Sequence, residues 1–91
     1  MMEKAIITVL GKDKIGIIAA ICNYLADSDI NVLDISQTIL DEYFNMIMIV
    51  DLESTTCDFK DISINLEQIG KKIGVIIKIQ KEEIFTNMHR I

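Results

Sequence analysis

Residues 11–16 of this chain, which read Gly-Lys-Asp-Lys-Ile-Gly, combine two glycines with one acidic and two basic side chains. They lie between an apolar segment predicted to be a strand and another predicted to be a helix. At such a junction the first N–H groups of the helix have no acceptor within it, and the helix dipole favours negative charge. The segment is therefore predicted to be a small-ligand binding loop that could receive an anion or a zwitterion.

The same residues also have structural interpretations. Asp13 could cap the helix by accepting hydrogen bonds from its first N–H groups, a contact that stabilises by about 1 kcal/mol. A cap and a ligand contact can coexist, so both interpretations of Asp13 stay open. Gly16 could admit a ligand close to the backbone or could serve tight packing of the helix on the sheet. Lys12 and Lys14 are expected to be solvated.

The rest of the sequence offers no catalytic group. Cys22 and Cys57 are far apart and lack a C-x-x-C pattern, and His89 is the one histidine, which disfavours a zinc site or a disulfide framework. Hydrolases of acylphosphatase type clamp phosphate with an arginine in a strand-to-helix loop, whereas the one arginine here is Arg90. We therefore predict a protein that is not an enzyme, with no cofactor and no metal. Isolated acids are poor evidence for a metal site: Asp13, Asp34 and Asp51.

Charge and hydropathy exclude further classes. Nine basic against fourteen acidic residues give a net charge of −5, and no lysine cluster forms, which disfavours nucleic acid as a partner. The longest apolar runs, such as residues 46–50, fall far short of the roughly 20 residues of a membrane span. Residues 1–10 are too short for the apolar core of a signal peptide. A cytoplasmic protein without a membrane partner is expected.

Hydrophobic periodicity predicts four strands and two helices in one domain. The strands are expected over residues 4–10, 30–40, 43–51 and 75–81. The helices are expected from 15 to about 26 and from 58 to about 72. The order β-α-β-β-α-β predicts an α+β fold, a ferredoxin-like sandwich whose four-stranded antiparallel sheet carries both helices on one face.

Several finer details are predicted. Gly11 is expected to end the first strand, and Gly70 and Gly74 are expected to bracket the end of the second helix. The turn formers of residues 27–29 are expected to end the first helix. The buried face of that helix is predicted to carry four residues at helical spacing: Ile18, Ile21, Cys22 and Leu25.

The sheet face opposite the helices would be bare, although several of its residues are apolar. Either the tail, residues 82–91, or another subunit is expected to cover it. The tail could form a short helix, since four apolar residues lie on roughly one side of it: Ile84, Phe85, Met88 and Ile91.

Three segments together resemble the ACT domain. They are Gly-Lys-Asp-Lys-Ile-Gly-Ile at 11–17, Asp-Ile-Asn-Val at 29–32 and Asp-Ile-Ser-Gln-Thr at 34–38. The chain looks most like small stand-alone ACT-domain proteins and is similar to the amino-terminal half of glycine-cleavage repressors. The resemblance covers about 4–81 of a single domain spanning 1–91. It implies a regulatory module that forms homodimers and binds an amino acid between the subunits.

The resemblance also implies a set of contacts. Asp13 matches a position that holds the ammonium group of the ligand, and Gly11 stands where some relatives carry a histidine. Backbone N–H groups of residues 15–17 would meet the carboxylate. Asn31 matches a polar position that contacts the ligand from the neighbouring subunit, although on its own it reads as a turn residue. The predicted ligand-binding set is Gly11, Lys12, Asp13, Ile15, Gly16, Ile17, Asn31 and Val32.

The sequence thus predicts a non-catalytic regulatory module that binds an amino acid or similar small molecule at a homodimer interface. No output domain is evident, so a signal would pass to a separate regulated protein. The alternative is a protein–protein interaction or assembly domain without a small-molecule ligand, which would use its apolar sheet face.

Overall fold

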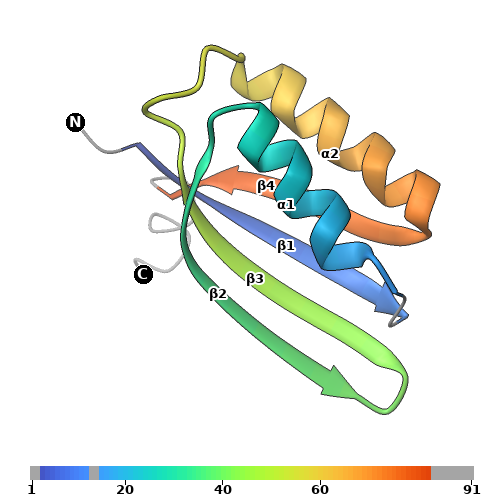
Figure 1. The fold of residues 1–91 in the computed structure, drawn as a ribbon. Helices are drawn as coiled ribbons and strands as arrows, with labels where there is room; N and C mark the ends of the chain where they lie inside the picture. The colour runs from blue at the N-terminus through green and yellow to red at the C-terminus, as the bar shows by residue number, and fades with distance from the viewer. Residues whose placement is uncertain (1–2, 13–14, 83–91) are drawn as a thin grey trace, which may run out of the picture.

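The computed structural model describes residues 3–12 and 15–82 of the chain. The elements follow in the order strand, helix, strand, strand, helix, strand, which confirms the predicted order (Figure 1). Their bounds are β1 Lys4–Lys12, α1 Ile17–Asp27, β2 Asn31–Leu40, β3 Tyr43–Asp51, α2 Phe59–Ile73 and β4 Val75–Lys81. The predictions for Asp13, for Lys14 and for residues 83–91 lie outside the described residues.

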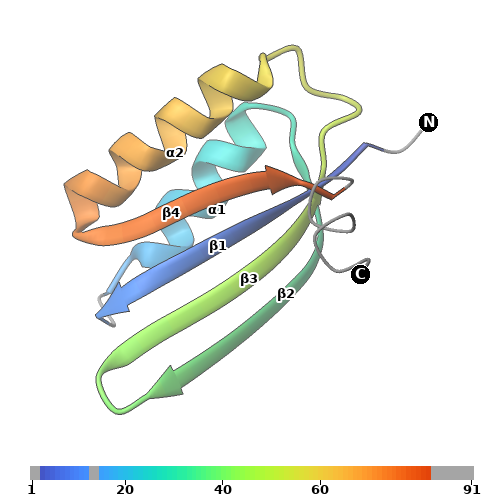
Figure 2. The same cartoon turned by 180° about the vertical axis from the view of Figure 1, so that it is seen from behind.

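The four strands form one antiparallel sheet in the order β2-β3-β1-β4. Both helices lie on one face of it, and the view from behind shows the other face bare of helices (Figure 2). β2 and β3 are joined by a tight hairpin in which Asp41 takes the left-handed conformation at φ 59°, which aspartate tolerates better than most residues. The arrangement confirms the predicted ferredoxin-like sandwich.

The hydrophobic core lies between the helices and the sheet. Alternate residues of β1, β3 and β4 are buried against the helices, as the two-residue period of a strand requires. Each fully buried aliphatic side chain stabilises the fold by about 1.5–3 kcal/mol. The largest fully buried side chains include Ile7, Val9, Ile21, Leu25, Met46, Met48, Ile62 and Leu66.

Gly11 does not end β1, contrary to the prediction. The strand runs on to Lys12, and Gly11 pairs with Phe44 of β3 and with Val75 of β4. A Cβ atom on Gly11 would lie 2.7 Å from Cγ1 of Val75. The glycine is therefore needed for close approach of β4 to β1, and the strand continues through it.

The predicted start and buried face of the first helix are also wrong in part. α1 begins at Ile17 because Gly16, its N-cap residue, takes the left-handed conformation at φ 92° and ψ −1°. Its buried residues are Ile17, Ile21 and Leu25, whereas Ile18 is 38% exposed. Ile21 and Leu25 are buried as predicted, and Cys22 is partly buried against the core. The end at Asp27 agrees with the predicted turn segment.

The two glycines at the end of α2 have different roles. Gly74 is the C-cap at φ 94°, and its N–H donates to the carbonyl oxygen of Gly70 at 2.7 Å, as predicted for a capping glycine. Gly70 lies inside the helix, where a Cβ atom would meet the backbone oxygen of Val75 at 2.6 Å. Gly70 thus lets α2 approach β4. It does not mark the end of the helix, contrary to the prediction.

Candidate functional site

The candidate loop joins the end of β1 to the start of α1 at one end of the sheet (Figure 1). The carbonyl of Gly16 accepts the first helical hydrogen bond, from the N–H of Ala20 at 2.9 Å. The N–H groups of the first helical turn have no acceptor within the helix, and the N-cap residue has no side chain to offer one. The start of α1 can therefore donate hydrogen bonds to an anionic group.

Gly16 stands in open space. Among the described residues, apart from Gly16 and its two chain neighbours, none places a heavy atom within 4 Å of the position that a Cβ atom would take there. Packing of helix on sheet therefore does not require this glycine, which removes one of its two sequence-based interpretations. What requires it is the positive φ, because the left-handed conformation is unfavourable for other residues.

The neighbours of Gly16 differ in how they could contact a ligand. Ile15 is fully exposed, at 104% of its reference area, whereas Ile17 is 2% exposed and can offer only backbone. Nζ of Lys12 lies 3.9 Å from Oε1 of Glu42 in the hairpin, and both side chains are well exposed. Such a surface pair is weak, so Lys12 is held only loosely at this end of the sheet.

Asn31 and Val32 lie at the opposite end of the sheet from the loop. Asn31 pairs with Asp51, which pairs with Lys4, whereas the loop follows Lys12. Eight residues of strand separate Lys4 from Lys12, a span of about 27 Å. One chain therefore brings together only part of the predicted set. At the loop end are Gly11, Lys12, Ile15, Gly16 and Ile17.

β2 forms an exposed apolar edge that the sequence did not reveal. Ile35 and Ile39 pair with Met48 and Phe44 and so lie on the face that carries the helices, yet they are 43% and 53% exposed. The helices do not extend over them. Leu33, beside a bulge between residues 32 and 34, is 39% exposed. We call these three residues, with the outer backbone of β2, the β2 edge surface.

The β2 edge surface lacks most devices that protect an edge strand from pairing. β2 is ten residues long, and its sequence, Asn-Val-Leu-Asp-Ile-Ser-Gln-Thr-Ile-Leu, holds one acid and no lysine or proline. Within the described residues no strand pairs with its outer edge. Such an edge is a template for another strand. The edge position of β2 depends on the order of the strands in the sheet.

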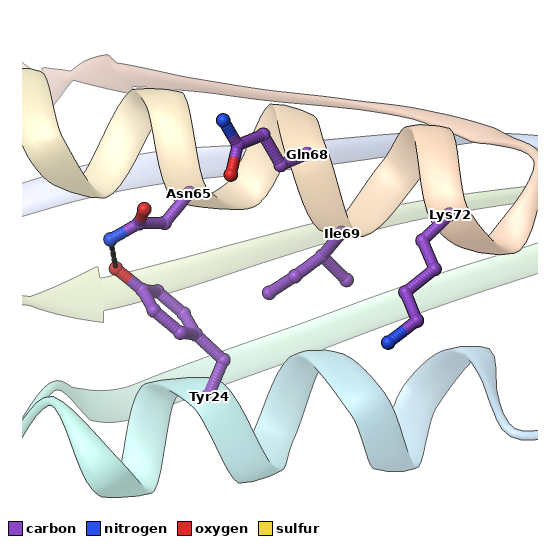
Figure 3. A pocket seen from close by; sticks show the side chains of 5 residues that line it. All are labelled: Tyr24, Asn65, Gln68, Ile69 and Lys72. Atoms are coloured by element: carbon purple, nitrogen blue, oxygen red, sulfur yellow. Dashed lines mark hydrogen bonds between the residues drawn. The ribbon is translucent and has the colours of Figure 1, made fainter.

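A hollow lies between the two helices on their outer side (Figure 3). It measures about 320 Å³ and is lined by Tyr24 of α1 and four residues of α2, namely Asn65, Gln68, Ile69 and Lys72. Nδ2 of Asn65 donates to the hydroxyl of Tyr24 at 3.1 Å and closes one end. The lining is mostly apolar with one cation. The sequence-based predictions did not include this hollow, although its α2 residues have helical spacing.

The described parts of the chain show no other chemical centre. No three His, Cys, Asp or Glu side chains among them are placed to hold a metal ion. The longest helix, α2, has 15 residues, and no described helix is long and apolar enough to cross a membrane. The candidate site therefore rests on the loop and the β2 edge surface.

Comparison with known proteins gives a consistent result. Residues 3–80 match a family model described as ACT domain. A UPF0237 protein of Bifidobacterium longum is 60% identical over 90 residues, which cover 99% of this chain and 100% of that protein. A UPF0237 protein of Clostridium acetobutylicum is 56% identical over 88 residues, covering 97% of this chain and 99% of that one.

Solved structures extend the comparison. An ACT domain protein from Streptococcus pneumoniae is 44% identical with a TM-score of 0.82, and the match covers 93% of this chain and 96% of that one. A putative glycine cleavage system transcriptional repressor has a TM-score of 0.77 at 16% identity, over 89% of this chain and 46% of that one. At that identity the likeness is one of fold alone.

Proposed function

The chain belongs to the ACT domain family, whose members are typically regulatory ligand-binding modules, and from that premise we propose that two copies pair through β2 and hold an amino acid or a similar zwitterion between them. The module is non-catalytic. Ligand binding strengthens the pairing of the subunits, or their docking to a separate regulated protein, because the ligand favours the state that binds it best.

The first support is the β2 edge surface. Antiparallel pairing of two β2 strands would satisfy the outer backbone groups of both and continue the sheet across the dimer. It would also cover Leu33, Ile35 and Ile39 of each subunit. Burying the exposed part of each side chain contributes about 1 kcal/mol. The interface thus has both a hydrogen-bonding edge and an apolar surface.

The second support, and the observation that carries the proposal, is the register of β2. A two-fold axis between Ile35 and Ser36 would set Asn31 of the partner subunit beside Leu40, since β2 runs from Asn31 to Leu40. Leu40 pairs with Tyr43, which pairs with Lys12 at the loop end. Pairing through β2 thereby brings the two separated halves of the predicted site to one end of the sheet. Two identical sites result.

The chemistry of each half then suits an amino acid. The first-turn N–H groups of α1 would bind the carboxylate, and the empty space beside Gly16 leaves room for it. Asp13 would take the ammonium group, as the resemblance implies. The amide of Asn31 of the partner subunit would supply a further hydrogen bond, and exposed Ile15 would cover the ligand.

One experiment tests pairing and binding together. Sedimentation velocity is expected to show a dimer for the wild type and a monomer for Ile35→Lys, because a buried lysine without a partner is costly. Ile64→Lys, on exposed α2, is the matched control, since Ile64 is 45% exposed and Ile35 43%. Calorimetric titration with each standard amino acid is expected to give one ligand per chain for wild type and Ile64→Lys, and none for Ile35→Lys.

The exposed edge also favours the alternative function. An assembly domain without a small-molecule ligand would use the same β2 edge surface, so it predicts the same dimer and the same effect of Ile35→Lys. It predicts no heat with any amino acid. A dimer without heat would thus favour the alternative, whereas a monomeric wild type would contradict both.

A further inference from the structure

The hollow between α1 and α2 has an apolar middle and polar groups at both ends. Ile69 of α2 and Tyr24 of α1 are half-buried and pack against the core. The lining residues of α2 stand at positions 65, 68, 69 and 72, the spacing of one helical face. Tyr24, Ile69 and Lys72 reach into the space between the two helices (Figure 3). The walls of the hollow are therefore two helices that the core holds in place.

Three polar groups of the hollow are available to a ligand. Within the part of the chain that the structure describes, Lys72 forms no ion pair and Gln68 no hydrogen bond. The hydroxyl oxygen of Tyr24 accepts from Nδ2 of Asn65 at 3.1 Å, which leaves the hydroxyl hydrogen of Tyr24 to donate. Each of these groups gains a partner if a polar molecule lies in the hollow.

The charges around the hollow differ between its two ends. The helices run antiparallel, so Lys72 lies near the start of α1 and Tyr24 near the first half of α2 (Figure 1). Lys72 is the cation among the described lining residues. Two acids lie beyond the other end, Asp27 three residues after Tyr24 and Asp61 four residues before Asn65. An anionic group is therefore attracted to the Lys72 end and repelled from the Tyr24 end.

The dimensions of the hollow suit a small ligand. Seven residues of helix separate Asn65 from Lys72, a length of about 10 Å. The volume of about 320 Å³ is at the lower end of the range for small-molecule sites. A single ring with a short side chain has about this length and fills such a space.

We propose that the hollow binds a carboxylic acid with an apolar body of one ring and a hydrogen-bonding group at the end opposite the carboxylate. The carboxylate contacts the ammonium group of Lys72 and the amide of Gln68, one helical turn before it. The ring packs between Tyr24 and Ile69, and its far polar group accepts from the hydroxyl of Tyr24. An ammonium group beside the carboxylate is disfavoured, because Lys72 repels it.

This site goes beyond the proposed function in two respects. Its described lining belongs to one chain, so it needs no pairing through β2. Its ligand is an anion, whereas the loop site is proposed to hold a zwitterion. The two sites can therefore be tested separately.

The test uses para-hydroxyphenylpropionate as the probe and the backbone amide NMR signals of the full chain. The dozen non-hydrogen atoms of the probe give an expected dissociation constant on the order of 1 mM, which a chemical-shift titration measures. Shifts are expected at residues 20–27 of α1 and 65–72 of α2, equally in the wild type and in Ile35→Lys. Tyramine, which has the same ring but an ammonium group instead of the carboxylate, is expected to cause none.

Three variants assign the contacts. Lys72→Glu is expected to weaken binding of the probe about tenfold, because an attraction is lost and a repulsion of similar size is gained. Lys71→Glu is the matched control, since it changes the net charge equally, and Lys71 lies 3.6 Å from Glu67 rather than in the hollow. Tyr24→Phe is expected to weaken binding of the probe but not that of phenylpropionate, which lacks the hydroxyl group.

Several outcomes would overturn the proposal. They are the absence of shifts at millimolar probe, shifts confined to residues 15–17 at the loop, and equal weakening by Lys71→Glu and Lys72→Glu in proteins whose spectra show a native fold. Loss of binding in Ile35→Lys would also overturn it, because the site would then depend on a subunit interface. A protein that gives no heat with any amino acid can still bind the probe, and the reverse, so failure of this proposal is distinguishable from failure of the proposed function.

Discussion

Mixing two inactive variants should restore ligand binding if each site is shared between subunits. In the proposed site Asp13→Ala would remove a loop contact and Asn31→Ala would remove the contact from β2, so each homodimer would have two defective sites. In a mixed dimer one site combines the intact loop of the Asn31→Ala subunit with Asn31 of the Asp13→Ala subunit. The other site carries both changes. Random exchange makes about half of the dimers mixed, so about a quarter of all sites should be intact.

The assay is calorimetric titration of each variant alone and of their equimolar mixture after exchange of subunits. The expected stoichiometry of the mixture is about a quarter of the wild-type value, with the affinity of the wild type. Sharing of each site between subunits is expected because the Asn31 and loop ends of one chain lie about 27 Å apart. No binding in the mixture, with exchange verified by mass spectrometry, would refute the shared site.

Three further results are expected from denaturation measurements. Leu66→Ala should lower the free energy of unfolding by about 2–5 kcal/mol, because Leu66 is fully buried in the core; a loss below 1 kcal/mol would contradict that packing. Gly74→Ala should lower the free energy of unfolding by about 1–2 kcal/mol, because Gly74 has a positive φ. Gly70→Ala should lower it further, because the added methyl group would meet the backbone of Val75. A larger loss for Gly74→Ala than for Gly70→Ala would be inconsistent with the close approach of α2 to β4. A ligand at a hundredfold excess over its dissociation constant should raise the free energy of unfolding by about 2.7 kcal/mol per site. If an amino acid that binds in calorimetry leaves the free energy of unfolding unchanged, the ligand does not bind to the folded state alone.

Periodicity was enough to predict the element order because each element has a clear repeat. β3 has the predicted bounds, Tyr43–Asp51, and β4 the predicted Val75–Lys81. The errors occur at glycines, which are compatible with several backbone conformations. Gly11 and Gly70 are required by contacts with Val75, which is distant in sequence, and nothing in their local sequence indicates this.

The candidate site was predictable only in part, for a similar reason. The loop is local in sequence, and the resemblance named its residues together with Asn31. The exposure of Ile35 and Ile39 depends on how far the two helices extend across the sheet. That depends on strand order, which hydrophobic periodicity does not specify. The same alternating pattern would be buried in a central strand and is exposed at an edge.

A shared site would link ligand binding to the pairing of subunits, and so to any separate protein that recognises the pair. If each site needs both subunits, ligand binding and dimerisation are linked, and each strengthens the other by the same factor. With two sites per dimer, a hundredfold excess of ligand over its dissociation constant would strengthen the dimer about 10⁴-fold, because the effect of one site, about 100-fold, is squared. The ligand concentration would thereby set the fraction of paired chains, and a regulated partner that recognises only the continuous sheet of the dimer would respond to it.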